Sequence, residues 1–486
     1  MNWRRQHRWS SLTVCFFLLT MCLSGIVLNH RPVADGVDVS RRLLPPFYYY
    51  DDWNQGLMRG TVSLGRDSVL VYGSAGLWLT DRRASRFADF NAMLPARAAS
   101  RVILSAARHG DTLLALTPEA LYISNLRDTN VSRRIQLTSA ERLSDMTVTA
   151  DSIVITGRSH LYVSSIEQFD FKKISLLAPD ESDFGRKTLF DKVWRFHSGE
   201  MFGTGGRLVV DAVALVLIFL IISGFIIWLM PRIIRRRAHG RRNVKPAAHF
   251  LKTNVRLHGR IGYYTLIFTV VCVFSGWLLR PPFLIALATL TTPAPECDNP
   301  WHDSLRMLRY DPDSRRWLLL TSCGAYTLSD LHAVPAATSV CPPVSVMGPT
   351  VFRQMAPGEW LVGSFSGLYR WHVDTGETRD YFTGAPAEKK AGPPFGRNAV
   401  AGYSDDFDSG PIVVTYDRGT DLIAQPDSLR YLPMPLWNVA LETHTGRIFF
   451  GNAATWFYIT FIGALALWSL ISGYCLHRKK KSLKSS

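Results

Sequence analysis

The chain has 486 residues, of which 47% are hydrophobic, and it carries 55 Lys and Arg against 39 Asp and Glu. Four apolar runs approach the ~20 residues that an α-helix needs to cross a hydrocarbon core, which excludes an ordinary water-soluble protein. The net charge of +16 is concentrated beside these runs, so it indicates contact with anionic membrane lipid and not nucleic-acid binding.

The apolar runs predict four membrane spans: Leu12 to Leu28, Leu208 to Met230, Ile261 to Leu279 and Ala453 to Leu476. The first run follows three Arg residues, a pattern also typical of a secretory signal peptide. We favour an uncleaved anchor, because the run has seventeen residues and no clear A-x-A cleavage site follows. Asp211 is an acidic residue close to the start of the second run, where it can reach the headgroup zone.

Basic residues next to the spans predict the orientation of the chain. Three Arg precede the first span, ten Lys or Arg and no acid occupy residues 232–260, and five more basic residues follow from Arg478. Since basic residues in short loops are retained in the cytoplasm, both termini are expected on that side. The two long segments between spans then lie on the far side of the membrane.

The sequence repeats itself as two copies of one unit, which consists of a span, an outer segment and a second span. Spans one and three each have a His eighteen residues before the Gly of a Ser-Gly pair, at His7 and His258. Spans two and four follow the related motifs HSGEMFG from His197 and HTGRIFFG from His444, and each has a Ser-Gly pair near its end. The duplication predicts a four-helix transmembrane bundle made of two repeated halves.

These features divide the chain into eight parts. In order they are the cytoplasmic N-terminus with the first span (1–29), the first periplasmic β-rich segment (30–196), the second span with its His motif (197–230), a basic cytoplasmic loop (231–257), the third span (258–279), the second periplasmic β-rich segment (280–442), the fourth span with its His motif (443–476) and a basic cytoplasmic tail (477–486).

Each outer segment contains pairs of short apolar runs around a turn, which is typical of β-hairpins. Three pairs start at Val69, Leu113 and Ile153, and three more start at Trp317, Trp360 and Pro411. The first three repeat at 40 to 44 residues, a period typical of one propeller blade. The stretch GLYRWHVDTG also resembles the blade repeats of sensor-type β-propellers. We expect either one six-bladed ring or two separate β-rich domains.

Three cysteines, Cys297, Cys323 and Cys341, lie outside the predicted spans. An oxidising compartment permits one disulfide among them, and the sequence does not select the pair. Because no CxxC or other zinc-ligand spacing occurs, a structural zinc site is not expected.

The matched histidines suggest a cofactor site. His7 and His258 should share one depth near the cytoplasmic face, and His197 and His444 should share another near the outer face. If the two halves are related by a twofold axis along the membrane normal, each pair of imidazoles can face one another across it. Haem iron takes neutral imidazole nitrogen as an axial ligand, so the pattern predicts two haems. His30 is a substitute ligand, and interfacial anchoring is the alternative role for each His.

The motifs that flank the spans are HRWSSL from His7, FHSGEMFG from Phe196, RLHGRIGYY from Arg256 and THTGRIFFG from Thr443. Together with the late Ser-Gly pairs, they resemble the PepSY-associated transmembrane family. Members of that family include inner-membrane dihaem reductases that act on ferric siderophores in the periplasm. The resemblance implies that role here, in a bacterial inner membrane, with two b-type haems held by the four matched histidines.

A ferric siderophore or another ferric complex is the expected substrate, because hard oxygen chelators hold Fe(II) far less tightly than Fe(III). The predicted cytoplasmic loops are too short to fold a flavin or nicotinamide domain, so a separate cytoplasmic reductase or a membrane quinol is the expected electron donor. No catalytic acid or nucleophile is expected. The main alternative is a haem-free sensor or accessory protein with a ligand-binding propeller. A transporter is less favoured, because the spans lack Pro-broken helices.

Overall fold

The computed structural model describes residues 2–65, 67–128, 132–138, 141–179, 186–293, 299–322, 324–345, 347–387 and 398–485. The chain divides into two compact units. The helical unit comprises Met1–Val39, Lys187–Pro293 and Pro435–Ser486, and the sheet unit comprises Ser40–Arg186 and Ala294–Met434. The two outer segments of the sequence therefore contribute to a single compact unit.

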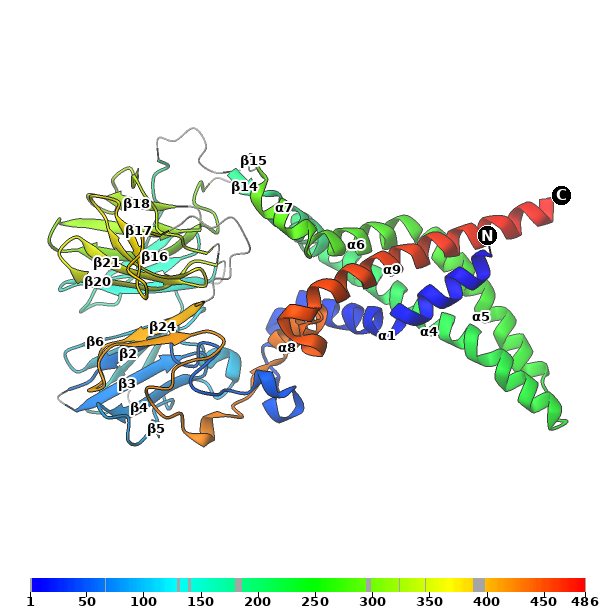
Figure 1. Ribbon diagram of the computed structural model, residues 1–486, viewed down its shortest axis with the longest axis horizontal. Helices are drawn as coiled ribbons and strands as arrows, with labels where there is room; N and C mark the ends of the chain where they lie inside the picture. The colour runs from blue at the N-terminus through cyan, green and yellow to red at the C-terminus, as the bar shows by residue number, and fades with distance from the viewer. Residues whose placement is uncertain are drawn as a thin grey trace. The chain divides into compact units, whose positions relative to one another are not determined.

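The helical unit contains three long helices and several shorter ones (Figure 1). They are α1 (Trp3–Asn29), α2 (Arg31–Ala34), α3 (Leu189–His197), α4 (Gly203–His239), α5 (Lys245–Tyr264), α6 (Leu266–Leu278), α7 (Phe283–Thr289), α8 (Leu436–His444) and α9 (Arg447–Ser485). Helix α1 packs against α4, α8 and α9, while α6 packs against α3 and α9. Residues 231–257, which were expected to form a basic loop, are largely helical, because α4 continues to His239 and α5 begins at Lys245.

Three helical stretches, Trp3–Asn29, Glu200–His239 and Thr455–Arg478, are long and apolar enough to cross a membrane. Helices α5 and α6 pass the same test only as a pair, bent by 67° at their junction. At this junction the Thr265 hydroxyl donates to the Ile261 carbonyl over 2.7 Å. Such a bond competes with the helix ladder and favours a bend. The expected third span is thus a broken pair of helices and not one continuous helix.

The sheet unit contains six antiparallel sheets in chain order (Figure 1). The first three consist of β2 (Gly60–Ser63), β3 (Ser68–Gly73), β4 (Gly76–Asp81) and β5 (Ala88–Asp89); β6 (Ser105–His109), β7 (Thr112–Leu116), β8 (Leu121–Asn125) and β9 (Ser132–Ile135); and β10 (Leu143–Val148), β11 (Ser152–Gly157), β12 (Leu161–Ser165) and β13 (Lys172–Ile174).

The other three sheets come from the second outer segment. They consist of β16 (Leu305–Asp311), β17 (Arg316–Thr321), β18 (Ala325–Leu328) and β19 (Ala336–Ala337); β20 (Pro349–Ala356), β21 (Glu359–Ser364), β22 (Gly367–His372) and β23 (Thr378–Asp380); and β24 (Val400–Ser404) with β25 (Ile412–Thr415). Short strands β1 (Asp38–Val39), β14 (Arg186–Thr188), β15 (Thr291–Pro293) and β26 (Met434–Pro435) lie where the chain passes between units.

The predicted hairpins are confirmed as the central strand pairs of five sheets. The run from Val69, for example, forms β3 and β4, which pair with Leu70 opposite Leu79. The run from Pro411 forms only one strand, β25, which pairs with β24. The first strand of each sheet was not predicted, because several of these strands carry charged or small residues that interrupt the apolar alternation.

Hydrophobic clusters join each sheet to the next and the sixth sheet to the first. The clusters include, in sheet order, Leu70 with Leu113, Leu114 with Ile153, Val154 with Leu319, Leu318 with Trp360, Leu361 with Val400, and Val414 with Val69. The sheets therefore follow one another in a cycle. The third of these contacts joins the two outer segments of the sequence.

Replacement of Leu319 by Ala tests this junction. Leu319 is fully buried among residues of the third and fourth sheets, so Leu319→Ala should lower the free energy of unfolding by about 2–5 kcal/mol. Denaturant unfolding of the detergent-purified protein, followed by Trp fluorescence, measures the change. Leu422→Ala is the control, since Leu422 is 55% exposed. Equal stability of the two variants would contradict the packing described here.

Candidate functional site

The four histidines of the repeated motifs form two pairs in the helical unit. The ring centroids of His7 on α1 and His258 on α5 are 6.2 Å apart. Those of His197 at the end of α3 and His444 at the end of α8 are also 6.2 Å apart. Each pair takes one imidazole from each half of the sequence. The structure thus brings together the residues that the repeat matches, and their role as metal ligands stays a prediction.

Each imidazole contacts a buried Ser that belongs to the opposite half of the sequence. The Nδ1 to Oγ distances are 3.5 Å for His7 and Ser472, 2.8 Å for His258 and Ser223, 3.0 Å for His197 and Ser275, and 3.3 Å for His444 and Ser24. These Ser residues are those of the four Ser-Gly pairs. The sequence located these pairs, but it did not identify the hydrogen bonds.

The hydrogen bonds decide which imidazole nitrogen carries the proton. Each of the four Ser hydroxyls donates to the carbonyl three residues earlier in its own helix, so its oxygen is left to accept from Nδ1–H. Nδ1 of His7 also lies 2.9 Å from the Ser469 carbonyl, and Nδ1 of His444 lies 2.8 Å from the Met21 carbonyl. Because a carbonyl can only accept, Nδ1 of His7 and His444 is protonated and Nε2 keeps its lone pair, and the Ser contacts of His197 and His258 fit the same tautomer.

The Gly of each Ser-Gly pair leaves space for an imidazole. An added Cβ would lie 2.7 Å from Cε1 of His197 at Gly276, 3.0 Å from Cε1 of His7 at Gly473, 3.2 Å from Cε1 of His444 at Gly25, and 3.4 Å from Cε1 of His258 at Gly224. Any larger residue would push the ring away at the tightest of these contacts. Ser and Gly together therefore fix both the tautomer and the place of each ring.

Burial keeps the outer histidines neutral. It lowers the pKa of His197 to about 4, with the nearby Arg280 acting in the same direction. Burial likewise lowers the pKa of His444 to about 3, assisted by His197 and Arg280. Burial also lowers the pKa of Arg280 to about 10, which still leaves it charged at neutral pH. The outer pair is thus uncharged and lies beside a buried cation.

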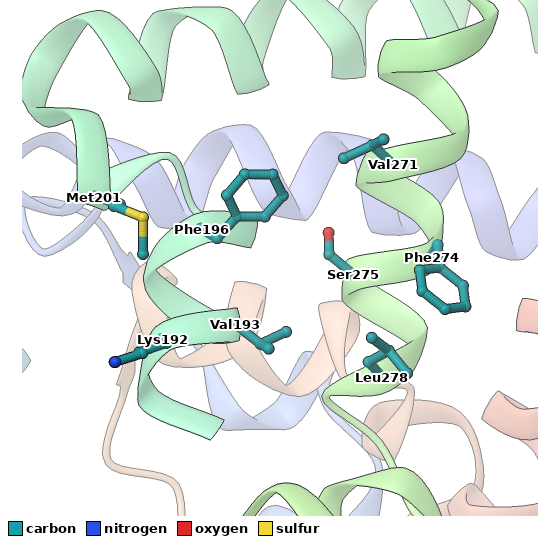
Figure 2. A pocket seen from close by; sticks show the side chains of 8 residues that line it. All are labelled: Lys192, Val193, Phe196, Met201, Val271, Phe274, Ser275 and Leu278. Carbon is teal, nitrogen blue, oxygen red and sulfur yellow. The ribbon is translucent and has the colours of Figure 1, made fainter. Parts of the chain in front are cut away.

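An apolar cavity of about 350 Å³ lies between α3 and α6. Figure 2 shows Val193 and Phe196 of α3 on one side of it and Val271, Ser275 and Leu278 of α6 on the other. Ser275 is the residue that bonds His197, so the cavity adjoins the outer pair. Its lining does not include either imidazole of the pair.

His30, which the sequence suggested as a substitute ligand, contacts Asp211 and belongs to neither histidine pair. Its Nε2 lies 3.0 Å from a carboxylate oxygen of Asp211, and the Asn29 amide donates to the other oxygen over 2.8 Å. Helix α4 begins at Gly203, so Asp211 lies about two turns inside it. The carboxylate is buried, and its expected reach to the headgroup zone stays a prediction.

Among the described residues, no group of three or more His, Cys, Asp or Glu side chains is placed to hold a metal ion by itself. Of the three cysteines considered for a disulfide, Cys341 is exposed, and Cys297 and Cys323 lie outside the described residues. The disulfide therefore stays a prediction. The two histidine pairs remain the sites where nitrogen donors converge.

Comparison with known families gives one match. The model of the family described as PepSY-associated TM region matches residues 167–480. A comparison with curated protein sequences found no match.

Solved structures give only distant similarity. The extracellular domain of a hybrid two-component system from B. thetaiotaomicron is 10% identical, with a TM-score of 0.37, and the match covers 74% of this chain and 32% of that one. PorZ, a surface component of the type-IX secretion system of Porphyromonas gingivalis, is also 10% identical, with a TM-score of 0.29 and coverage of 76% and 38%. The chain thus matches about a third of the length of these structures, and similarity at this level indicates neither a shared fold nor a shared function.

The bonds of Asp211 predict its contribution to stability. Asp211→Ala removes the acceptor for both Asn29 and His30, which should cost about 1–3 kcal/mol and lower the thermal unfolding midpoint of the purified protein. His30→Ala should cost less, because Asn29 continues to bond Asp211. A larger loss from His30→Ala than from Asp211→Ala would contradict this arrangement.

Proposed function

The chain belongs to the PepSY-associated TM family, and we propose that it carries electrons across a bacterial inner membrane through two b-type haems, each held by two histidines. The proposed acceptor is a ferric siderophore or another ferric complex in the periplasm. The proposed donor is a cytoplasmic reductase or a membrane quinol. The observation that carries the proposal is the equal separation of the two imidazole pairs.

This separation fits a shared iron atom. A metal–imidazole bond is about 2.0 Å long, and an imidazole nitrogen lies about 1.2 Å from its ring centroid, since the ring bonds are about 1.35 Å long. Two imidazoles that share one metal atom in line are therefore about 6.4 Å apart between centroids. Both pairs have centroids 6.2 Å apart.

The donor chemistry also fits. Neutral imidazoles with protonated Nδ1 offer the Nε2 lone pair that an axial ligand of haem iron needs. The Ser residues hold Nδ1–H as the outer partners of metal-ligating histidines do, which orients the ring and raises its basicity. A bound haem would supply reversible one-electron transfer between Fe(III) and Fe(II). Arg280 would place a positive charge near the outer haem, which carries acidic propionates.

The two pairs lie at different depths along α1. This helix contains His7 of one pair, and its Gly25 contacts His444 of the other pair. Eighteen residues separate the two positions, which corresponds to about 27 Å of helix. A hydrocarbon core is about 30 Å thick, so sites at these two levels would lie near its opposite faces. The basic residues beside the spans support cytoplasmic termini, which would make the pair of His7 and His258 the cytoplasmic one.

The proposal includes two finer statements about the fold. The three long apolar helices and the bent pair α5–α6 would form a four-span bundle around the histidines. The six sheets would form a six-bladed β-propeller on the periplasmic side. The cycle of hydrophobic clusters between successive sheets supports the propeller.

Haem content tests the proposal directly. The purified protein should contain about two haems per chain, measured by the pyridine haemochrome spectrum. His197→Ala removes one nitrogen donor of the outer pair and should reduce the content to about one. The control His30→Ala should retain both, because His30 bonds Asp211. A folded, colourless wild-type protein would reject the proposal and favour the haem-free sensor.

The acceptor is tested separately by mixing dithionite-reduced protein with a ferric siderophore in a stopped-flow instrument. Reoxidation of the reduced α bands together with trapping of Fe(II) by ferrozine is the expected result. Haem that is present but unreactive towards ferric complexes would leave electron transfer intact and reject this class of acceptor.

The hydrogen bond of Ser275 gives a further prediction. Ser275→Ala should weaken binding of the outer haem by about 10- to 100-fold. The midpoint potential of that haem should also rise, because a less basic imidazole stabilises Fe(III) less. Haem transfer to apomyoglobin and spectroelectrochemical titration measure these changes. Thr269→Ala is a control on the same helix, since the buried Thr269 hydroxyl donates to the Leu266 carbonyl and, within the described residues, bonds no histidine. Identical behaviour of the two variants would contradict a role for Ser275 in positioning His197.

A further inference from the structure

A cavity of about 300 Å³ lies within the sheet unit and does not involve the paired histidines. The first strands of all six sheets, β2, β6, β10, β16, β20 and β24, contribute to its lining. The cavity therefore lies where the six sheets converge. Its lining combines apolar side chains, such as Met146, Met307 and Phe352, with three arginines and two tyrosines.

Two of the three arginines are neutralised by neighbouring carboxylates. Arg309 forms an ion pair with Asp145, which is also in the lining, and it donates further to the Phe352 and Leu308 carbonyls. Arg353 forms an ion pair with Asp405 over 2.8 Å. These two cations thus have acceptors within the protein.

Arg59 is different. Within the part of the chain that the structure describes, no ion pair or hydrogen bond of its guanidinium is found. Its backbone is held firmly, since its N–H donates to the Tyr72 carbonyl over 2.8 Å and its carbonyl accepts from Tyr403 N–H over 3.3 Å. Gly402 allows this contact, because an added Cβ there would lie 2.6 Å from the Arg59 carbonyl oxygen. Among the described residues, Arg59 is thus the arginine of this lining that has no carboxylate partner.

Tyr72 adds a neutral donor next to this cation. Burial raises the pKa of Tyr72 although Arg309 opposes the shift, so its phenol stays protonated at neutral pH. Its hydroxyl occupies the space beside Gly60, only 2.5 Å from where a Cβ would lie. Burial also raises the pKa of Tyr403. Neutral phenols beside a guanidinium can donate to an anion without adding charge.

We propose that this cavity binds a small organic carboxylate, with Arg59 pairing with the carboxylate and Tyr72 donating a hydrogen bond. A guanidinium presents two parallel N–H groups that match a carboxylate. The apolar side chains of the lining accommodate the body of an organic acid, which an inorganic anion lacks. Arg59 offers one charge to a monoanion, and the carboxylate of Asp406, which accepts from Thr61 of the lining, disfavours an ion of higher negative charge. This inference goes beyond electron transfer and does not depend on bound haem.

Calorimetric titration of the full-length, detergent-purified protein with benzoate tests the site. Benzoate should bind with one site per chain, and the uncharged analogue benzyl alcohol should not bind. Arg59→Gln should weaken benzoate binding at least about tenfold, because it removes a charge-assisted hydrogen bond. Arg83→Gln should leave binding unchanged, since that side chain is 85% exposed. Arg59→Lys keeps the charge but lacks the two parallel N–H groups of the guanidinium, so it should weaken binding less than Arg59→Gln.

Three results would overturn the assignment. They are absence of benzoate binding to the wild type, equal binding of benzoate and benzyl alcohol, and complete displacement of benzoate by equimolar chloride, which would identify a simple halide site. The comparison of benzoate with benzyl alcohol needs no variant, so the test remains decisive even if substitution of Arg59 prevents folding. Haem content, measured on the same samples, tests the electron-transfer proposal independently of benzoate binding.

Discussion

The hydrogen bond from imidazole Nδ1 to a Ser of the opposite half is the contact on which the candidate site depends. It occurs four times, and in each case the Ser hydroxyl proton is already engaged by a carbonyl of its own helix. At His7 and His444 a further contact, to a backbone carbonyl, places the proton on Nδ1, and the Ser contacts fit the same tautomer at His197 and His258. A single such bond contributes only about 0.5–1.5 kcal/mol to stability. Its larger effect is on chemistry, because a protonated Nδ1 leaves the lone pair of Nε2 available.

The crossed pattern makes the two halves interdependent. His197 and Ser275 come from different halves, as do His444 and Ser24 at the same level. At each level, therefore, each half supplies one imidazole, together with the Ser and Gly that hold the imidazole of the other half. A half alone would contain histidines without their acceptors and glycines without the rings they accommodate. Duplication within one chain places both in the same molecule.

Much of this arrangement could be predicted because it depends on spacing. The repeat matched His7 with His258 and His197 with His444, and the alternation of apolar residues located the hairpins. Hydropathy measures the length of an apolar run but not its direction, so the bend at Thr265 could not be seen. The bonding of Ser275 and of His30 depends on which helices become neighbours, and a single sequence does not give this. Arg59 was missed because its importance arises only when six sheets converge on one cavity.

The surroundings of the buried outer pair explain why its imidazoles are uncharged, but they do not satisfy all of its hydrogen-bonding groups. His197 and His444 are kept neutral by burial and by the charge of Arg280, so they do not repel one another as cations would. Neutrality alone does not satisfy them, because each imidazole still has a second nitrogen. No hydrogen bond to Nε2 of either residue is found within the described residues. A buried acceptor without a donor costs about 1–3 kcal/mol, so an unpartnered Nε2 on each ring would lower stability. A bound metal would satisfy both nitrogens at once. Apolar residues of the same size would serve helix packing equally well, so packing alone does not account for imidazoles at both levels.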